Sequence, residues 1–328
     1  MGLSAAIERA FGSKQQGPTI HDTEWVKGWM DTSGSLPVPR VDWIRRRYAD
    51  VAYGDDPLQR LDLYLPNEAV LGRPYPLLVV IHGGGFTHMD KADWHLYPGF
   101  FALEAGFAVA SINYRLAPKA KFPQPVKDVS AALQFLADHA WQYDLDVDNF
   151  FLMGTSAGGS LALLTGLGAG PGGAPSQSTR KPTIRAVAAL CPATDLGAAY
   201  RWAMEHGSIP VKVGVRLMLQ RYLGSTPDKH PEIAAAASPE KWLDIAVACG
   251  KPIPATYFLQ GDQDPIVPWE LTFACYEMFQ QRSGLPADAL YYETLPGAGH
   301  AGGGPDFLNP APNRRLVRWF ATHIKKGE

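Results

Sequence analysis

Short, unbroken runs of apolar residues recur along the chain, each six to eight residues long. A strand with one solvated face alternates apolar and polar residues, whereas an unbroken run is typical of a strand buried on both faces. Such strands belong to parallel sheets that helices cover on both sides. The runs therefore predict strands of a buried parallel sheet at Pro76–His82, Phe107–Tyr114, Asn149–Gly154, Ile184–Cys191 and Pro254–Gly261.

One segment shows strict alternation instead. In the sequence RLDLYLP, Leu61, Leu63 and Leu65 share one face of an extended chain, and Asp62 and Tyr64 share the other. Alternation with period two is typical of a half-buried strand. We therefore expect an edge strand with one solvated face here.

Between the apolar runs, apolar residues recur every three to four positions. This pattern begins after Pro125 with Val126 and Val129, returns after Pro268, and closes the chain around Phe320. The spacing predicts amphipathic helices, and proline is favoured in a first helical turn. Because strand and helix alternate, the sequence predicts an α/β fold with a mostly parallel, doubly wound sheet.

Two segments interrupt the alternation. Residues 1 to about 45 precede the first predicted strand, and residues from about 196 to 244 are aromatic-rich and helical in pattern. An insertion that follows the carboxyl end of a strand lies over the ligand crevice of such a sheet. We expect a lid at about 196–244 within a catalytic domain of residues 46–328. The N-terminal extension, residues 1–45, is a second candidate contributor to the lid.

Composition narrows the function classes. The chain has 328 residues, 46% of them apolar, and its 30 basic and 32 acidic residues leave a net charge of −2. This balance, without a long block of either sign, argues against nucleic acid and against a membrane-surface partner. The three cysteines are too few and too scattered for a disulfide framework or a zinc site. The chain start lacks the apolar core of a signal peptide, and no stretch is long and apolar enough to span a membrane, so we expect a cytoplasmic location.

The first motif that carries chemistry is GTSAG, Gly154–Gly158, which joins a predicted strand to a predicted helix. GxSxG in this context is the signature of a nucleophile elbow, a tight turn that exposes the serine hydroxyl. Ser156 is then the candidate nucleophile, and the amide of Ala157 lies at the start of the helix, where it can face a developing negative charge. The simpler alternative is a glycine-rich turn with an incidental serine.

The second motif is IHGGGF, in which His82–Phe86 directly follow a predicted buried strand. Adjacent glycines let the main chain approach a ligand and present its amides without obstruction by side chains. HGGG loops in lipases and esterases hold the oxyanion in this way. A glycine turn alone would explain the residues, but not their occurrence together with GxSxG in this order.

A serine nucleophile needs a base, and the base needs an orienting acid. Both follow the serine along the chain in hydrolases with a GxSxG elbow. Of the nine histidines, His300 lies in a glycine-rich loop after a predicted strand, whereas His323 lies in the terminal helix and is expected to be solvated. Asp262 and Asp264 both follow the preceding strand, and either could instead serve as a turn or capping residue.

Together these segments resemble the α/β-hydrolase superfamily, specifically its hormone-sensitive-lipase-like esterases of the GTSAG type and the related acetylesterase and BD-FAE-like group. The resemblance covers about residues 48–325 and includes further short motifs: DLYLP, MDK, NYRLAP, FPQPVKDV and ASPE. It implies an eight-stranded sheet with helical lid elements. One departure is Thr155, where many members carry aspartate.

The resemblance implies a triad of Ser156, Asp264 and His300, and an oxyanion hole made by the amides of Gly84, Gly85 and Ala157. Its chemistry needs no metal and no other cofactor. The implied function is hydrolysis of short-chain carboxylic esters through an acyl-enzyme, with a small-molecule ester as the partner and a homodimer left open. Alternatives are a deacetylase or feruloyl-type esterase for acylated carbohydrates and, as a different class, a non-catalytic receptor on the same fold.

Overall fold

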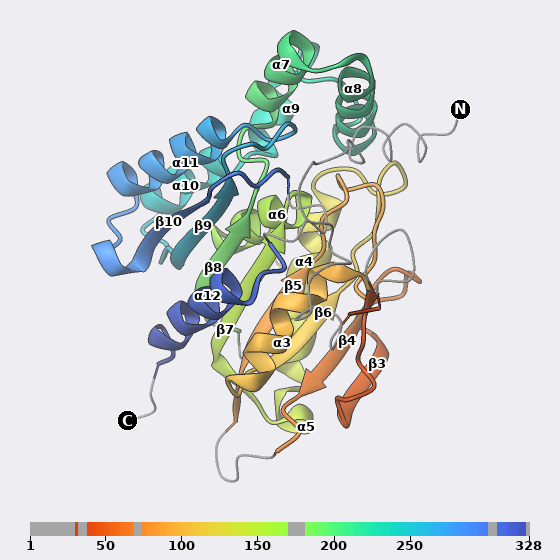
Figure 1. Ribbon diagram of the computed structural model, residues 1–328, viewed down its shortest axis with the longest axis vertical. Coiled ribbons are helices and arrows are strands. Elements are labelled where there is room, and N and C mark those ends of the chain that lie inside the picture. The colour runs from red at the N-terminus through yellow and green to blue at the C-terminus, as the bar shows by residue number, and fades with distance from the viewer. Residues whose placement is uncertain (1–29, 32–37, 69–73, 170–180, 301–306, 326–328) are drawn as a thin grey trace.

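The computed structural model describes residues 30–31, 38–68, 74–169, 181–300 and 307–325. Eight strands form one sheet in the order β10-β9-β8-β7-β5-β6-β4-β3 (Figure 1). Their bounds are β3 Arg46–Ala52, β4 Arg60–Leu65, β5 Tyr75–Ile81, β6 Ala108–Ile112, β7 Leu145–Thr155, β8 Ile184–Leu190, β9 Ala255–Gly261 and β10 Leu290–Leu295. The six strands from β10 to β6 in this order are parallel to one another, which confirms the mostly parallel eight-stranded sheet.

The prediction of an edge strand at β4 was wrong. β4 pairs antiparallel with both β3 and β6, so it lies inside the sheet. Its second face is buried as well, with Asp62 only 5% exposed and Tyr64 only 4% exposed. A buried carboxylate needs a partner, and Lys91 supplies one with its Nζ 3.0 Å from Asp62. The alternation therefore reflects a buried ion pair and not a solvated face.

The apolar runs fold as strands because both faces of the sheet are covered. In β5, Leu77 and Val79 belong to one core, and Leu78 and Val80 belong to the other. Because neither face of the strand is solvated, its sequence is an unbroken apolar run. The helices that cover the sheet are α3 Tyr97–Glu104, α4 Gln124–Asp138, α6 Ala157–Gly166, α10 Pro239–Ala248, α11 Trp269–Arg282 and α12 Pro310–Thr322.

Two layers of helices lie on opposite sides of this sheet (Figure 1). Side chains of α4, α6, α10 and α11 share a core with one face, as Leu133 and Leu161 illustrate. Side chains of α3 and α12 share a core with the other face, as Phe100 and Phe320 illustrate. The chain is therefore doubly wound. Short elements between these include the 3-10 helices η2 Trp94–Leu96 and η3 Ala287–Ala289 and the helix α5 Ala140–Tyr143.

Of the N-terminal extension, residues 1–29 and 32–37 lie outside the described residues. Contrary to expectation, strands precede residue 45: β1 Met30–Asp31 pairs antiparallel with β2 Val38–Pro39 in a separate two-stranded sheet. Met30 and Ile44 are buried in the core that α3 and α12 share. These described parts of the extension therefore pack against the sheet domain.

The insertion between β8 and β9 contains α7 Leu196–His206, α8 Ile209–Leu223 and α9 Pro231–Ala236, followed by α10. In Figure 1, α7, α8 and α9 lie at the top, above the sheet. By contrast, α10 places Leu243 and Ala246 in the core against the sheet. No helix among the described residues combines the length and the hydropathy that crossing a bilayer requires.

Candidate active site

Ser156 lies at the turn between β7 and α6, and its backbone has φ 54° and ψ −119°. A non-glycine residue rarely adopts this left-handed conformation, because its Cβ crowds the backbone. The turn persists because both sides of it are held. The Ser156 amide donates to the Leu190 carbonyl at 2.8 Å, and its own carbonyl accepts from the Ser160 amide at 3.1 Å.

Glycines flank the serine for steric reasons. A Cβ on Gly154 would lie 2.1 Å from the carbonyl oxygen of Gly158, and a Cβ on Gly158 would lie 2.2 Å from the carbonyl oxygen of Ile81. Both obstacles are backbone atoms, which cannot move without shifting a strand or the helix. The sharp turn inferred from the motif is therefore present, and it needs both glycines.

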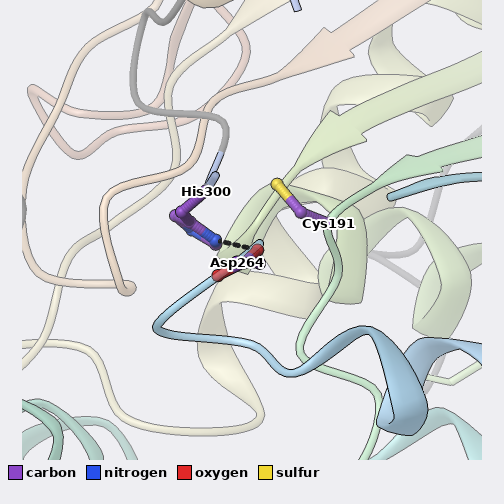
Figure 2. Close-up of side chains that lie close together, drawn as sticks. All are labelled: Cys191, Asp264 and His300. Carbon is purple, nitrogen blue, oxygen red and sulfur yellow. Dashed lines mark hydrogen bonds and ion pairs between the residues drawn. The ribbon is translucent and has the colours of Figure 1, made fainter. Parts of the chain in front are cut away.

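The structure brings Ser156, His300 and Asp264 together from three separate loops. His300 Nε2 lies 3.0 Å from Ser156 Oγ. On the other side of the ring, His300 Nδ1 lies 2.7 Å from Asp264 Oδ2, the contact that the dashed line marks in Figure 2. The side chains of His300 and Asp264 are almost completely buried. His323 is remote from this group, and its Nδ1 contacts the Trp319 carbonyl at the end of α12.

Asp264 receives donors on both carboxylate oxygens. Its Oδ1 accepts from the amides of Ile266 and Val267, each at 2.9 Å, and its Oδ2 accepts from Gln260 Nε2 at 3.1 Å in addition to His300. These four donors hold the carboxylate in one orientation, with Oδ2 toward the histidine. Sequence reasoning missed Gln260, because it reads as one polar residue inside an apolar strand.

Asp262 has a different environment. Its Oδ1 accepts from the Gly297 amide at 2.7 Å, which ties the loop after β9 to the loop that leads to His300. The two aspartates that the sequence left as alternatives therefore have separate partners. Asp264 contacts the histidine, and Asp262 contacts a loop amide.

Burial and the carboxylate act on His300 in opposite directions. Burial disfavours the imidazolium, but Asp264 first, and the neighbouring Cys191 after it, outweigh burial and raise the pKa of His300 well above its usual value. A higher pKa makes the imidazole a stronger base toward the serine hydroxyl. Asp264 also fixes the tautomer, because a proton on Nδ1 leaves Nε2 free to accept.

A cysteine thiol lies beside this pair, although no motif in the sequence predicts it there. Cys191 follows β8, is completely buried, and has φ 38°. Figure 2 shows it next to Asp264 and His300, and the three potential ligand atoms lie within 4.8 Å of one another. Among the described residues this is the one group of three side chains that could hold a metal ion. Asp264 and His300 already bond to each other, and His300 also contacts Ser156, which fits a hydrolytic triad better than a metal site.

The loop of the HGGGF motif, His82–Phe86, is called the glycine loop below, and hydrogen bonds to its carbonyls fix it in place. The Gly83 carbonyl accepts from the Tyr114 hydroxyl at 3.1 Å, and the Gly84 carbonyl accepts from the amides of Thr87 and His88 at 3.1 and 3.3 Å. In a trans peptide the N–H points opposite to the C=O. The amides of Gly84 and Gly85 therefore point away from these donors.

His82 supports the same loop. Its Nδ1 lies 2.9 Å from the Gly83 carbonyl oxygen, and its ring stacks on Tyr114 at 4.4 Å. Burial lowers the pKa of His82 to about 4, so the ring is neutral at ordinary pH. It can therefore brace the loop without placing a positive charge beneath it.

An apolar pocket opens beside Ser156. Its wall combines the oxyanion-hole candidates with helices of the insertion: Gly85, Phe86, Ser156, Ala157, Ala193, Leu196, Ala199, Val215, Met218, Leu219, Ile266 and Val267. Gly84 is not among these lining residues, but it directly precedes Gly85, which is. The aromatic residues of the insertion are absent from this described lining.

Helix α8 touches the glycine loop directly. Gly85 has φ +57°, and a Cβ there would lie 2.2 Å from Met218 Sδ. One residue further on, the ring of Phe86 stacks on Tyr222 at 3.7 Å with 3° between the planes. The loop is therefore packed between the sheet and the insertion.

Comparison with known proteins places these features in a family. The BD-FAE family model matches residues 61–278. Esterase LipC of Mycobacterium tuberculosis is 27% identical over 86% of this chain and 67% of its own length. Esterase LipQ of the same organism is 28% identical over 91% of this chain and 68% of its own length.

A solved structure shares the architecture. The truncated form of a carbohydrate esterase from gut microbiota superimposes with a TM-score of 0.70 at 20% identity, over 87% of this chain and 99% of that one. At this identity the likeness shows the fold.

Proposed function

The chain belongs to the BD-FAE family of α/β-hydrolases, and on that premise we propose that it is a serine carboxylesterase with Ser156, His300 and Asp264 as its triad. The observation that carries the proposal is the continuous hydrogen-bond path from Asp264 through His300 to Ser156 Oγ. A serine hydroxyl becomes a nucleophile when an adjacent base takes its proton and a third group orients that base.

In the first half-reaction, Ser156 Oγ attacks the ester carbonyl carbon while its proton moves to His300 Nε2. The carbonyl oxygen gains the negative charge, and the amides of Gly84, Gly85 and Ala157 stabilise it. His300 then gives its proton to the departing alcohol oxygen, and the acyl group remains on the serine.

In the second half-reaction, His300 takes a proton from water as the water attacks the acyl carbon. The second tetrahedral intermediate collapses, Ser156 regains its proton, and the carboxylic acid leaves. Throughout, the Asp264 carboxylate stabilises the imidazolium without taking up a proton itself.

We further propose a preference for short acyl chains of about two to six carbons. The apolar lining suits an acyl chain, and we expect Met218 and Leu219 of α8, which form part of that lining, to limit its length. Deacetylation of acylated carbohydrates fits the same pocket, and a solved structure with this fold is described as a carbohydrate esterase. The receptor alternative gains no support, since His300 lies within bonding distance of the serine.

A substrate panel tests these proposals. It contains p-nitrophenyl esters from acetate to laurate, an acetylated oligosaccharide, methyl ferulate and a peptide anilide. We expect the fastest turnover on acetate or butyrate esters and none on the anilide. Faster hydrolysis of laurate than of butyrate would refute the short-chain preference. Binding without turnover of any ester would favour the receptor. The cytoplasmic location and the homodimer stay predictions.

A further inference from the structure

A second aspartate–histidine pair lies behind the glycine loop, outside the triad. His95, in η2, is buried, and its Nδ1 contacts Asp93 Oδ1. Its Nε2 faces the loop and accepts from the Gly83 amide at 3.1 Å. The arrangement parallels the triad, with a backbone amide in the place that Ser156 occupies beside His300.

Asp93 determines how the His95 ring carries its proton. Asp93 Oδ1 also accepts from the His95 amide at 3.1 Å, and Oδ2 accepts from the Asp90 amide at 3.1 Å. Burial opposes the charge on this carboxylate, but His95 brings the pKa of Asp93 down to about 2. A carboxylate at Nδ1 requires the proton there, so Nε2 keeps the lone pair that the Gly83 amide needs.

Gly83 connects this pair to the nucleophile. A Cβ on Gly83 would lie 2.9 Å from the Thr155 carbonyl oxygen and 3.4 Å from Ser156 Cβ, so the loop rests directly on the elbow. The Gly83 amide is bound by His95, and the Gly83 carbonyl is bound by Tyr114. Once both peptide groups around this residue are fixed, the direction of the next amide, that of Gly84, is fixed as well.

We propose that Asp93 and His95 are positioning residues for the oxyanion hole. They hold the Gly83 amide through an unprotonated Nε2 and thereby aim the amides of Gly84 and Gly85 at the reacting carbonyl oxygen. This inference rests on the proposed esterase function. It adds a pair that touches neither substrate nor serine and acts through the loop.

The test compares a short ester with its thionoester, in which sulfur replaces the carbonyl oxygen. Sulfur accepts hydrogen bonds poorly, so the oxygen-to-sulfur rate ratio reports the oxyanion hole in particular. The concentration of active enzyme is measured by titrating Ser156 with a stoichiometric organophosphate ester. Each kcat is then calculated per active site, which corrects for misfolded protein. KM is measured alongside kcat for both substrates.

His95→Phe keeps a ring of similar size but removes the acceptor. We expect kcat on the ester to fall by about 10- to 100-fold, near the range for loss of an oxyanion donor. We expect the thionoester to keep its kcat, with little change in KM, so the ratio falls by the same factor as the ester, about 10- to 100-fold. His95→Gln restores an acceptor oxygen at the reach of Nε2 and should return the ratio to within about threefold of wild type. Asp93→Ala should lower the ratio in the same direction as His95→Phe.

The matched control is Asp90→Ala. Asp90 is a carboxylate of the same loop, but its side chain accepts from Asn113 and from the Ala92 amide. We expect lower stability and an unchanged ratio. Equal losses on both substrates in His95→Phe, or a His95→Gln variant as impaired as His95→Phe, would overturn the proposal. If His95→Phe fails to fold, Asp93→Ala takes its place in the test. An unchanged oxygen-to-sulfur rate ratio in Asp93→Ala would then overturn the proposal. Failure of the triad itself would appear separately, as activity retained in Ser156→Ala.

Discussion

Replacing Asp264 by asparagine tests the triad in the most detail, because the structure gives this carboxylate four donors. Asparagine has one acceptor oxygen and one NH₂ group, so the NH₂ must face donors on one side. Turned toward His300, it donates to Nδ1 and forces the proton onto Nε2, where it blocks the serine. Turned the other way, it meets the amides of Ile266 and Val267.

We expect kcat to fall by about 10³- to 10⁴-fold, the loss that the wrong tautomer causes in serine hydrolases. At 1.36 kcal/mol per factor of ten, this is about 4 to 5.5 kcal/mol of transition-state stabilisation. Leaving a buried donor unsatisfied costs about 1 to 3 kcal/mol, so the melting temperature should fall by several degrees. The acid limb of the residual activity should move to lower pH, because Asp264 raises the pKa of His300 and burial alone lowers it.

Asp262→Asn is the matched control. The same chemical change occurs two residues away, at a side chain whose hydrogen-bond partner in the described part of the chain is the Gly297 amide, and the asparagine carbonyl can still accept from that amide. We expect kcat within about twofold of wild type and a stability change below roughly 1 kcal/mol. The assay is p-nitrophenyl acetate hydrolysis between pH 5 and 9, with thermal unfolding of each variant. If Asp262→Asn loses kcat and Asp264→Asn keeps it, the assignment is reversed.

Three further outcomes follow from the site. Ser156→Ala and Ser156→Gly should both lose about 10⁴-fold in kcat, but glycine should be the more stable by about 1 kcal/mol because φ is positive; equal melting temperatures would argue against strain. Gly158→Ala should abolish activity and destabilise the fold, and a near-native variant would contradict the close contact. A thiol reagent should titrate only Cys249 in the native protein and all three cysteines after unfolding, since Cys191 and Cys275 are buried; a second fast thiol would contradict that burial.

Local pattern predicted the fold well because burial on both faces imposes an unbroken apolar run. The same reasoning failed at β4, where Asp62 looked solvated. Its neutralising partner Lys91 lies 29 residues away, and no local sequence pattern indicates that contact. Strand β3, at the edge of the sheet, has mostly exposed side chains. Its sequence therefore contains no apolar run from which a strand could be predicted.

For the site, spacing identified the residues whose roles depend on local geometry. Gly154, Ser156 and Gly158 share one turn, and a short motif contains all of its steric requirements. The supporting residues were missed because folding brings them in from elsewhere. Cys191 and His95 reach the site from other loops, and nothing in their own neighbourhoods distinguishes them from core residues.

The contact between α8 and the glycine loop limits how this enzyme can diversify. Met218 lines the pocket beside Ser156 that we propose for the acyl group, and it also lies against Gly85, while Tyr222 stacks on Phe86. The wall that selects the acyl group and the loop proposed to stabilise its charge are thus one packing unit. A substitution or segment exchange in α8 that widens the pocket also disturbs the loop. Substrate range and turnover rate should therefore change together in laboratory evolution, and altered selectivity at full speed would need compensating changes on both sides of the contact.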